Sequence, residues 1–386
     1  MEKMLDYEIL RSTGAGIFNV LGKAKALERE GKKILHFEIG QPDFNTPEHV
    51  KDAAKQALDD NFTGYVAAGG IMELKEKIQE DIHRTRGFKP SINQIMVFPG
   101  GNTIIYYALR SVIDSPGEEI IYPDPGFPTY GAVVHYLQAG NKSLSLKEEN
   151  EFRMNPNDVE KLVTSKTKAM IINSPQNPTG AVMKPAEVDR IAELSKKHNF
   201  FVLSDEIYSK MTYDEEFHSC SVHDECKERT IILDGVSKSY SMTGWRLGWA
   251  IAPEWVIDRM GLLLSIGISC TSSFIQKGGV AALTGPQDSI TSNMKAFRKR
   301  RDVIVKGLNE VNGFSCLKPE GAFYVFPNIT KTGMTSQECA DHMLKNGVCG
   351  LPGTIFGPSG EGYLRFSYAT SIEVIKEGIE KLKSIF

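Results

Sequence analysis

One lysine in the stretch VSKSYSMTGWRLGW, residues 236–249, has neighbours that suit covalent chemistry. Lys238 lies between two serines, and Arg246 follows eight residues later. A lysine that attacks a carbonyl must be partly neutral, and burial or a nearby cation lowers its pKa. Arg246 is a candidate for that cation, and its guanidinium could also bind a phosphate through two hydrogen bonds. Either charge taken alone is more typical of a solvated group beside a turn.

A candidate anion-binding turn lies earlier in the chain. Gly100-Gly101-Asn102-Thr103 opens a helical segment, so its backbone N–H groups and the helix dipole favour a bound anion. The glycines let the backbone approach a ligand closely. A cofactor with both an aldehyde and a phosphate would use this turn together with the lysine and the arginine. Pyridoxal 5'-phosphate is such a cofactor, and its ring nitrogen also needs an acidic partner.

Asp205 is the candidate for that acidic partner. A buried carboxylate beside the pyridine nitrogen would hold its proton and make the ring an electron sink. Tyr208 lies three residues later, and Tyr208 and Asn177 could both donate hydrogen bonds to the phenolic oxygen of the ring. The alternative is that Asp205 caps a helix, because the sequence SDE is also typical of a helix start.

Short β-rich runs alternate with helical segments, such as 103–113 and 185–199, in the middle of the chain. Apolar strands separated by helices are typical of a mostly parallel sheet covered on both faces. Ligands of such sheets bind beyond the carboxyl ends of the strands, which is where the polar candidates stand. The expected strands are 95–98, 119–123, 168–173, 200–205, 230–234 and 247–252.

The pattern changes beyond about residue 285, where charged helical segments and short strands predict a smaller α+β domain. Near the N-terminus, a helix over 20–31 and an apolar strand over 34–40 could pack on either domain. We expect an N-terminal arm with part of the small domain over 1–47, a large cofactor-binding domain over 48–285 and a small domain over 286–386. The C-terminal elements expected are helices 292–311, 336–347 and 371–386 and strands 322–327 and 363–368.

Composition excludes several classes of protein. The formal net charge of −3 argues against a nucleic-acid partner. No apolar run approaches the roughly 20 residues of a membrane span, and the N-terminus lacks the features of a signal peptide. The six cysteines form no Cys-x-x-Cys pair, so we expect reduced thiols and a cytoplasmic protein.

The segment HSCSVHDEC, residues 218–226, is a candidate metal site. Its two histidines and two cysteines are ligands that zinc accepts. Their spacing fits no standard zinc pattern, however, and the segment reads as a charged loop before a strand. We therefore expect a solvated loop there and no metal in the site. The four side chains concerned are His218, Cys220, His223 and Cys226.

Six motifs together resemble, in order and over nearly the whole chain, those of the class I/II pyridoxal-phosphate-dependent aminotransferases. This family has the fold type I of aspartate aminotransferase. Agreement of six ordered motifs by chance is very improbable. The motifs are GQPDFNTPEHV (40–50), YVAAGGIMELKEKI (65–78), NSPQNPTGAV (173–182), SDEIYSKMTYD (204–214), SKSYSMTGWRLGW (237–249) and GYLRFSYA (362–369).

The resemblance implies an α/β fold whose large domain has a mostly parallel seven-stranded sheet between helices, beside a smaller α+β domain. It also implies pyridoxal 5'-phosphate as cofactor and a homodimer with shared active sites. Lys238 would form the aldimine, a Schiff base. Asp205 would pair with the ring nitrogen, and Asn177 and Tyr208 would bind the ring oxygen. The other implied contacts are Phe127 stacked on the ring; Gly101, Asn102, Ser237 and Arg246 on the phosphate; Tyr65 on the phosphate of the neighbouring subunit; and Arg365, with Gly40 and Asn177, on the substrate carboxylate.

Two departures from the family pattern leave the individual phosphate donors open. Many members carry Ser or Thr three residues before the lysine, where this chain has Gly235. Many also read Ser/Ala-Thr/Lys-Glu/Gln-Ala after the first glycines of the phosphate turn. This chain has Gly101-Asn102-Thr103-Ile104 instead.

The implied reaction is ping-pong transfer of an amino group between an L-amino acid and a 2-oxo acid. A carbon–sulfur β-lyase using the same site is the alternative enzyme. A non-catalytic regulator is a further alternative, although no DNA-binding appendage is visible and every catalytic position is filled. The donor and acceptor stay open. Arg110 could reach an acidic substrate side chain or lie at the surface, whereas Ile17, Phe18 and Ile39 would suit an uncharged or aromatic donor.

Overall fold

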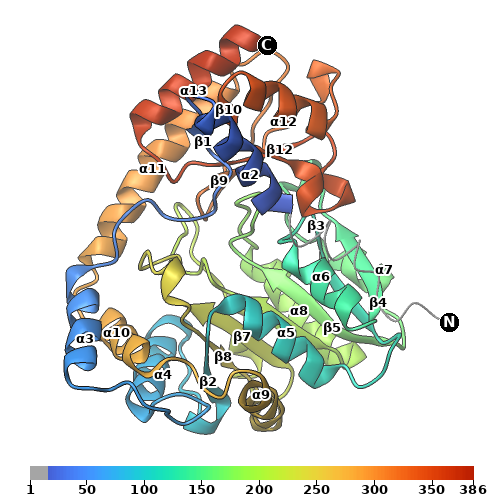
Figure 1. The fold of residues 1–386 in the computed structure, drawn as a ribbon. Helices are drawn as coiled ribbons and strands as arrows, with labels where there is room; N and C mark the ends of the chain where they lie inside the picture. The colour runs from blue at the N-terminus through green and yellow to red at the C-terminus, as the bar shows by residue number, and fades with distance from the viewer. Residues whose placement is uncertain (1–15) are drawn as a thin grey trace, which may run out of the picture.

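A seven-stranded sheet organises most of the chain in the computed structural model, which describes residues 16–386 (Figure 1). The strand order is β2-β8-β7-β6-β5-β3-β4. β8 pairs antiparallel with β2 and β7, and the other pairs are parallel. The strands are β2 (Ile95–Phe98), β3 (Glu119–Asp124), β4 (Gly140–Ser145), β5 (Thr167–Asn173), β6 (Phe201–Asp205), β7 (Thr230–Gly235) and β8 (Gly248–Ile251).

This sheet confirms the predicted fold class, and all six strands expected from apolar runs are present within one residue at each end. The seventh strand, β4, was not among those runs because its sequence, GNKSLS, is mostly polar. β4 lies at the edge of the sheet and pairs only with β3, so most of its side chains face solvent rather than a core.

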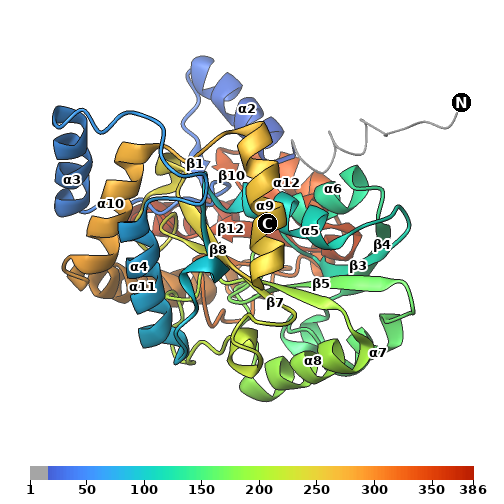
Figure 2. The same cartoon turned by 90° about the horizontal axis from the view of Figure 1, so that it is seen from below.

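Helices cover both faces of the sheet, as continuous apolar strands require. Along β2, Met96 and Phe98 face one hydrophobic cluster, while Ile95 and Val97 face another. Figure 2 shows α5, α6 and α9 on one side and α7 and α8 on the other. The helices are α4 (Met72–Arg86), α5 (Gly101–Val112), α6 (Thr129–Tyr136), α7 (Pro156–Leu162), α8 (Pro185–His198), α9 (Glu254–Gly267) and α10 (Ser273–Thr284), with α3 (Glu48–Asp59) packed on α10.

A smaller α+β part lies beyond one edge of this sheet, at the top of Figure 1. It contains segments from both the N-terminal and the C-terminal part of the sequence, because β1 (Leu35–His36) pairs in parallel with β10 (Val348–Cys349). A second small sheet has the order β11-β12-β9. The domain boundaries at 47/48 and 285/286 stay a prediction. The remaining elements are α2 (Gly16–Arg29), α11 (Asp288–Leu308), β9 (Tyr324–Val325), α12 (Ser336–Lys345), β11 (Leu351–Pro352), β12 (Leu364–Ser367) and α13 (Ile372–Ile385).

The strand expected over 34–40 is wrong in its length, because β1 covers only Leu35–His36. Beyond Phe37 the chain leaves β10 and turns toward the large sheet. There the carbonyls of Glu38 and Gly40 accept hydrogen bonds from side chains, those of Arg365 and Lys238, instead of from a neighbouring strand. The apolar run therefore marks a mostly buried segment, in which only Leu35–His36 is a strand and Ile39 is exposed.

Within residues 16–386, no helix combines the length and the apolar character that crossing a bilayer requires.

Candidate active site

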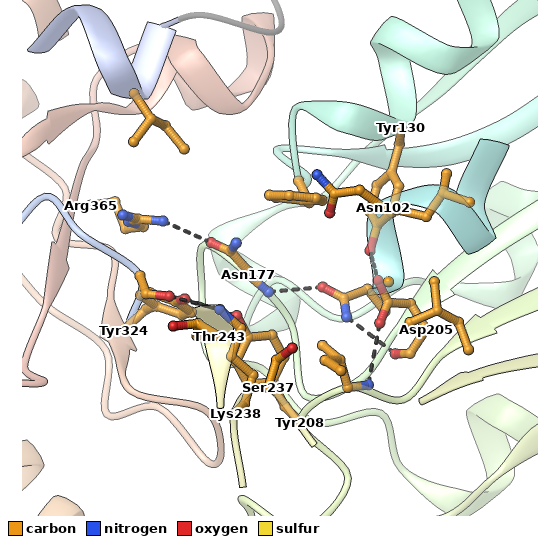
Figure 3. Close-up of a pocket in the computed structure, with 18 of the residues that line it drawn as sticks. Asn102, Tyr130, Asn177, Asp205, Tyr208, Ser237, Lys238, Thr243, Tyr324 and Arg365 are labelled. Atoms are coloured by element: carbon orange, nitrogen blue, oxygen red, sulfur yellow. Dashed lines mark hydrogen bonds between the residues drawn. The ribbon is translucent and has the colours of Figure 1, made fainter. Parts of the chain in front are cut away.

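A cavity of about 200 Å³ lies between the carboxyl edge of the large sheet and the small sheet that contains β12. Of the twelve predicted site residues, eleven line this cavity, and Figure 3 shows several of them pointing into it. Their positions along the chain extend from 40 to 365. The eleven are Gly40, Gly101, Asn102, Phe127, Asn177, Asp205, Tyr208, Ser237, Lys238, Arg246 and Arg365.

Lys238 follows β7 by three residues and is partly buried on the floor of the cavity. Its Nζ donates a hydrogen bond to the carbonyl oxygen of Gly40 at 2.7 Å. Burial, together with the charges of Arg365 and Arg246 and against the opposing effect of Asp205, lowers the pKa of Lys238 to about 8. A lysine with this pKa is neutral often enough to act as a nucleophile near neutral pH.

Asp205 is the last residue of β6, and its side chain is buried. One carboxylate oxygen accepts a hydrogen bond from the Tyr130 hydroxyl at 2.6 Å, and the other accepts one from the N–H of Ile207 at 3.3 Å. Burial raises the pKa of Asp205 to about 6 despite these two donors. No cation within the described residues forms an ion pair with this carboxylate, although it faces a cavity. A ligand with a protonated ring nitrogen would supply one.

One end of the cavity, at the N-terminus of α5, suits a phosphate. Gly101 opens α5, so unpaired N–H groups of a twelve-residue helix face the cavity. Gly100 has φ 89° and ψ 166°, a conformation that is essentially limited to glycine. A Cβ atom at this position would also collide with the guanidinium of Arg246. Ser237 and Arg246 complete this end, so the donors belong to three separate segments.

Arg365 lies on β12, at the other wall of the cavity, and is almost completely buried. Its Nη1 donates to Asn177 Oδ1 at 3.2 Å (Figure 3), and its Nη2 donates to the carbonyl of Glu38. Its Nε has no partner within the described residues. Burial lowers the pKa of Arg365, and no carboxylate in the described part of the chain pairs with it. A guanidinium in this state is suited to bind a carboxylate ligand.

The comparison with known proteins agrees with this geometry. The family described as "Aminotransferase class I and II" matches residues 32–382. The chain belongs to that family.

Three relatives show how similar the chain is to characterised aminotransferases. It is 40% identical to an aspartate aminotransferase of Pyrococcus abyssi, over 92% of each chain. It is 39% identical to aromatic-amino-acid aminotransferase 2 of Thermococcus litoralis, over 91% of each chain. The structure of aspartate aminotransferase from Thermus thermophilus with maleate superposes with a TM-score of 0.92, at 33% identity and 96% of each chain.

The protein is therefore a pyridoxal-phosphate-dependent aminotransferase that acts on amino acids and 2-oxo acids. The relatives do not favour the carbon–sulfur lyase. The cavity suits the cofactor on the three grounds already described. It has a buried carboxylate that pairs with no cation of the described residues, and a lysine with a lowered pKa. It also has a glycine turn in which a Cβ atom at Gly100 would collide with Arg246. When bound, the cofactor supplies an aldehyde and an electron-withdrawing ring.

The residues that line the cavity of this aminotransferase include three with hydroxyl groups that the sequence did not single out. Tyr130 holds Asp205, Tyr324 shares a hydrogen bond of 2.8 Å with the Tyr208 hydroxyl, and Thr243 lies near Arg246. Tyr130 lies in α6 and Tyr324 in β9, where aromatic residues are usually core residues. Only the tertiary structure separates these two tyrosines from the rest of the core.

Of the other residues considered for substrate recognition, some line the cavity and some do not. Ile17 lines the cavity, whereas Ile39 is exposed and does not. The side chain of Phe18 lies outside what the structure describes. Arg110 donates to the carbonyl of Ile113 at 2.6 Å and lines a different, surface depression. It therefore does not reach the cavity of its own subunit.

The His218–Cys226 segment does not bring its histidines and cysteines together. The Nε2 atoms of His218 and His223 both form hydrogen bonds with the same carboxylate oxygen of Asp189, at 3.0 and 2.7 Å. Cys220 and Cys226 are buried in two different hydrophobic clusters. The four side chains thus do not form the zinc site that their residue types allowed.

Proposed function

We propose that Lys238, Asp205 and Tyr208 carry the chemistry of this aminotransferase. Lys238 Nζ would bind the cofactor aldehyde, take the proton from the substrate Cα and deliver it to the former aldehyde carbon of the cofactor. Asp205 would keep the ring nitrogen protonated. Tyr208, with Asn177, would bind the ring oxygen. The observation that carries this proposal is the convergence on one cavity of a lysine, a buried carboxylate and a guanidinium, and the last two have no ion-pair partner among the described residues.

The remaining residues would orient the cofactor and the substrate. The phosphate would be held at the N-terminus of α5, with Arg246 as its cation, and Phe127 would lie against the ring face. Arg365 would bind the α-carboxylate of the substrate through its planar fork of N–H groups. The phosphate contacts proposed are Gly101, Asn102, Ser237 and Arg246, and the substrate contacts are Gly40, Asn177 and Arg365.

Cofactor attachment to Lys238 is expected to accelerate with pH. Only the neutral amine attacks an aldehyde, and a group whose pKa is lowered to about 8 loses its proton as the pH rises through 8. Its neutral fraction should then increase about tenfold from pH 7 to pH 9. The measurement is the rate at which cofactor-free enzyme forms its visible absorption band after addition of pyridoxal phosphate. Binding of pyridoxamine phosphate, which has no aldehyde, is the control. An equal pH dependence for both would argue against the assignment.

Substitution of Arg365 tests substrate recognition. Arg365→Lys keeps the charge but loses the fork, which should raise KM for amino donors by about 10–100-fold, since hydrogen bonds between charged groups contribute roughly 1.5–3 kcal/mol. The matched control is Arg110→Lys, which should change KM by no more than about twofold. If the two variants behaved alike, Arg365 would not be the carboxylate contact.

We further propose that the enzyme is a homodimer in which Tyr65 reaches the phosphate in the active site of the neighbouring subunit. Tyr65 is 91% exposed and is the one predicted site residue outside the cavity of its own chain. α9 also exposes Leu262 and Ile266, at 64% and 78%, which is costly for large apolar side chains unless another surface covers them. A second copy of this chain would do so.

Mixing two defective variants tests this shared site. If Tyr65 acts across the interface, a hybrid of Tyr65→Ala and Lys238→Ala subunits contains one native site, because the Lys238-containing subunit receives Tyr65 from its partner. Activity should then appear on subunit exchange and be absent when either variant is alone at the same low cofactor concentration. No gain on mixing, with exchange confirmed by differently tagged subunits, would contradict the proposal.

We also propose a reducing, cytoplasmic setting. All six cysteines are free thiols and five of them are buried. A reducing compartment keeps such thiols unpaired.

A further inference from the structure

A cluster of metal-ligand side chains lies outside the active site, between α2 and the β1–β10 pair. Its members are His36, Glu38 and Cys349, and their donor atoms all lie within 4.8 Å of one another. The strand register produces this grouping. His36 is the direct partner of Cys349 across the ladder, and Glu38 stands two residues after His36. We propose that these three side chains form a binding site for a thiophilic divalent cation, with Zn²⁺ as the natural ion.

Glu38 gives the strongest indication of a missing ligand. Its side chain is completely buried, and one oxygen bonds to His36 Nδ1 at 2.8 Å. The other oxygen accepts no N–H or O–H hydrogen bond within residues 16–386. The Cys349 thiol, a weak donor, interacts with the Glu38 carboxylate, and a metal ion would replace this contact. Buried carboxylate oxygens are normally satisfied, because an unsatisfied one loses its hydration without compensation. A cation bound between this carboxylate and its neighbours would compensate it.

His36 has the orientation that metal-binding histidines usually have. Its Nε2 bonds to Glu28 Oε1 at 3.0 Å, so Nδ1 is the nitrogen that faces Glu38 and the cluster. A carboxylate on the second ring nitrogen fixes the ring and makes the first nitrogen a better ligand. Glu28 belongs to α2, so the helix that covers the cluster also orients its histidine. The His36 side chain is 32% exposed, which gives an ion a path to the site.

Cys349 decides which ions fit. Sulfur favours Zn²⁺ and Cd²⁺ over Mg²⁺ and Ca²⁺, which prefer oxygen ligands alone. Burial raises the pKa of the Cys349 thiol, so the thiol is protonated without an ion. Binding would release this proton to solvent, together with any proton on His36 Nδ1, and would involve no oxidation. Three protein ligands and one water would complete tetrahedral coordination.

The cluster adjoins the substrate end of the active site. The Glu38 side chain belongs to the cluster, while its backbone carbonyl accepts from Arg365 and the carbonyl of Gly40 accepts from Lys238. An ion at the cluster would therefore fix the segment on which both side chains rest. Because an ion could affect activity through these contacts, the test is based on binding rather than on turnover.

The experiment uses the enzyme with its cofactor, freed of metal by a chelator. Zn²⁺ is titrated by calorimetry, and Cd²⁺ is titrated while the ultraviolet absorption of the cadmium–thiolate bond is recorded. One ion per chain is expected. Cys349→Ser should lose the cadmium band, and Glu28→Gln, which leaves all three ligands in place, should weaken Zn²⁺ binding by about 10–100-fold. The control is Cys270→Ser, which removes the least buried thiol and should change neither signal.

Two results would overturn the site. The first is the absence of saturable one-to-one binding by the native enzyme. The second is a cadmium band that persists in Cys349→Ser or disappears in Cys270→Ser. Should Cys349→Ser fold poorly by circular dichroism, Glu28→Gln decides alone, because the Glu28 side chain is 43% exposed and its replacement leaves the core intact. Unchanged Zn²⁺ affinity in Glu28→Gln would then reject the site.

Discussion

Replacement of Lys238 with alanine is expected to lower kcat/KM by at least about 10⁴-fold, because the amine both attaches the cofactor and moves the substrate proton, and acid–base catalysis alone contributes up to roughly 10⁴. The fold should survive. Lys238 is only partly buried, and its side chain donates a hydrogen bond to the carbonyl of Gly40, a residue that lines the cavity. The measurement is steady-state transamination with the best donor–acceptor pair, together with circular dichroism.

Small primary amines provide the control for this variant. If Lys238→Ala is inactive because it lacks the amine that transfers the proton, added methylamine should restore part of that proton transfer. The same amine should leave the native enzyme unchanged. A variant that kept native rates, or one that lost its fold, would remove the basis for assigning the chemistry to Lys238.

Asp205→Asn is expected to have the second largest effect, a loss in kcat of about 10²–10³-fold, comparable to removal of a preorganised electrostatic group from other active sites. The neutral amide cannot hold a proton on the ring nitrogen. Three acidic residues lie close together here, but Glu206 and Asp234 both pair with Arg86 at 2.8 Å. Of the three, Asp205 alone forms no ion pair with a residue of the described range 16–386, so it is the carboxylate available to the ring nitrogen of the cofactor.

The measurement for Asp205→Asn is the rate of a single half-reaction, followed by cofactor absorption after mixing with an amino donor. Tyr130→Phe is the matched control. It removes the 2.6 Å hydrogen bond to the carboxylate but keeps the charge, so its effect should be much smaller. Equal losses in the two variants would mean that positioning of the carboxylate, rather than its charge, is what matters.

Much of the large domain is predictable from local pattern. Apolar runs four to six residues long located β2, β3 and β5 to β8, since strands covered by helices on both faces need apolar side chains on both faces. The same reasoning missed β4, whose polar edge position gives no such run, and it extended β1 too far. A run of apolar residues reports burial, and burial does not distinguish a strand from a buried turn.

The sequence by itself determined the kind of chemistry and the segments that supply it. A lysine between serines, an acid at the end of a strand and a glycine turn before a helix indicated a pyridoxal-phosphate site, and the order of the motifs indicated the family. These signals are local, because backbone periodicity and turn preferences act over a few residues.

The contacts that tune the site were decided only by the tertiary structure. Arg365 meets Asn177, and Tyr324 meets Tyr208, because the small β11-β12-β9 sheet faces the carboxyl edge of the large one. The β1–β10 register likewise brings His36 beside Cys349. Such contacts depend on how elements far apart in the sequence pack together. The spacing of residues along the chain does not show which of them will be close in space.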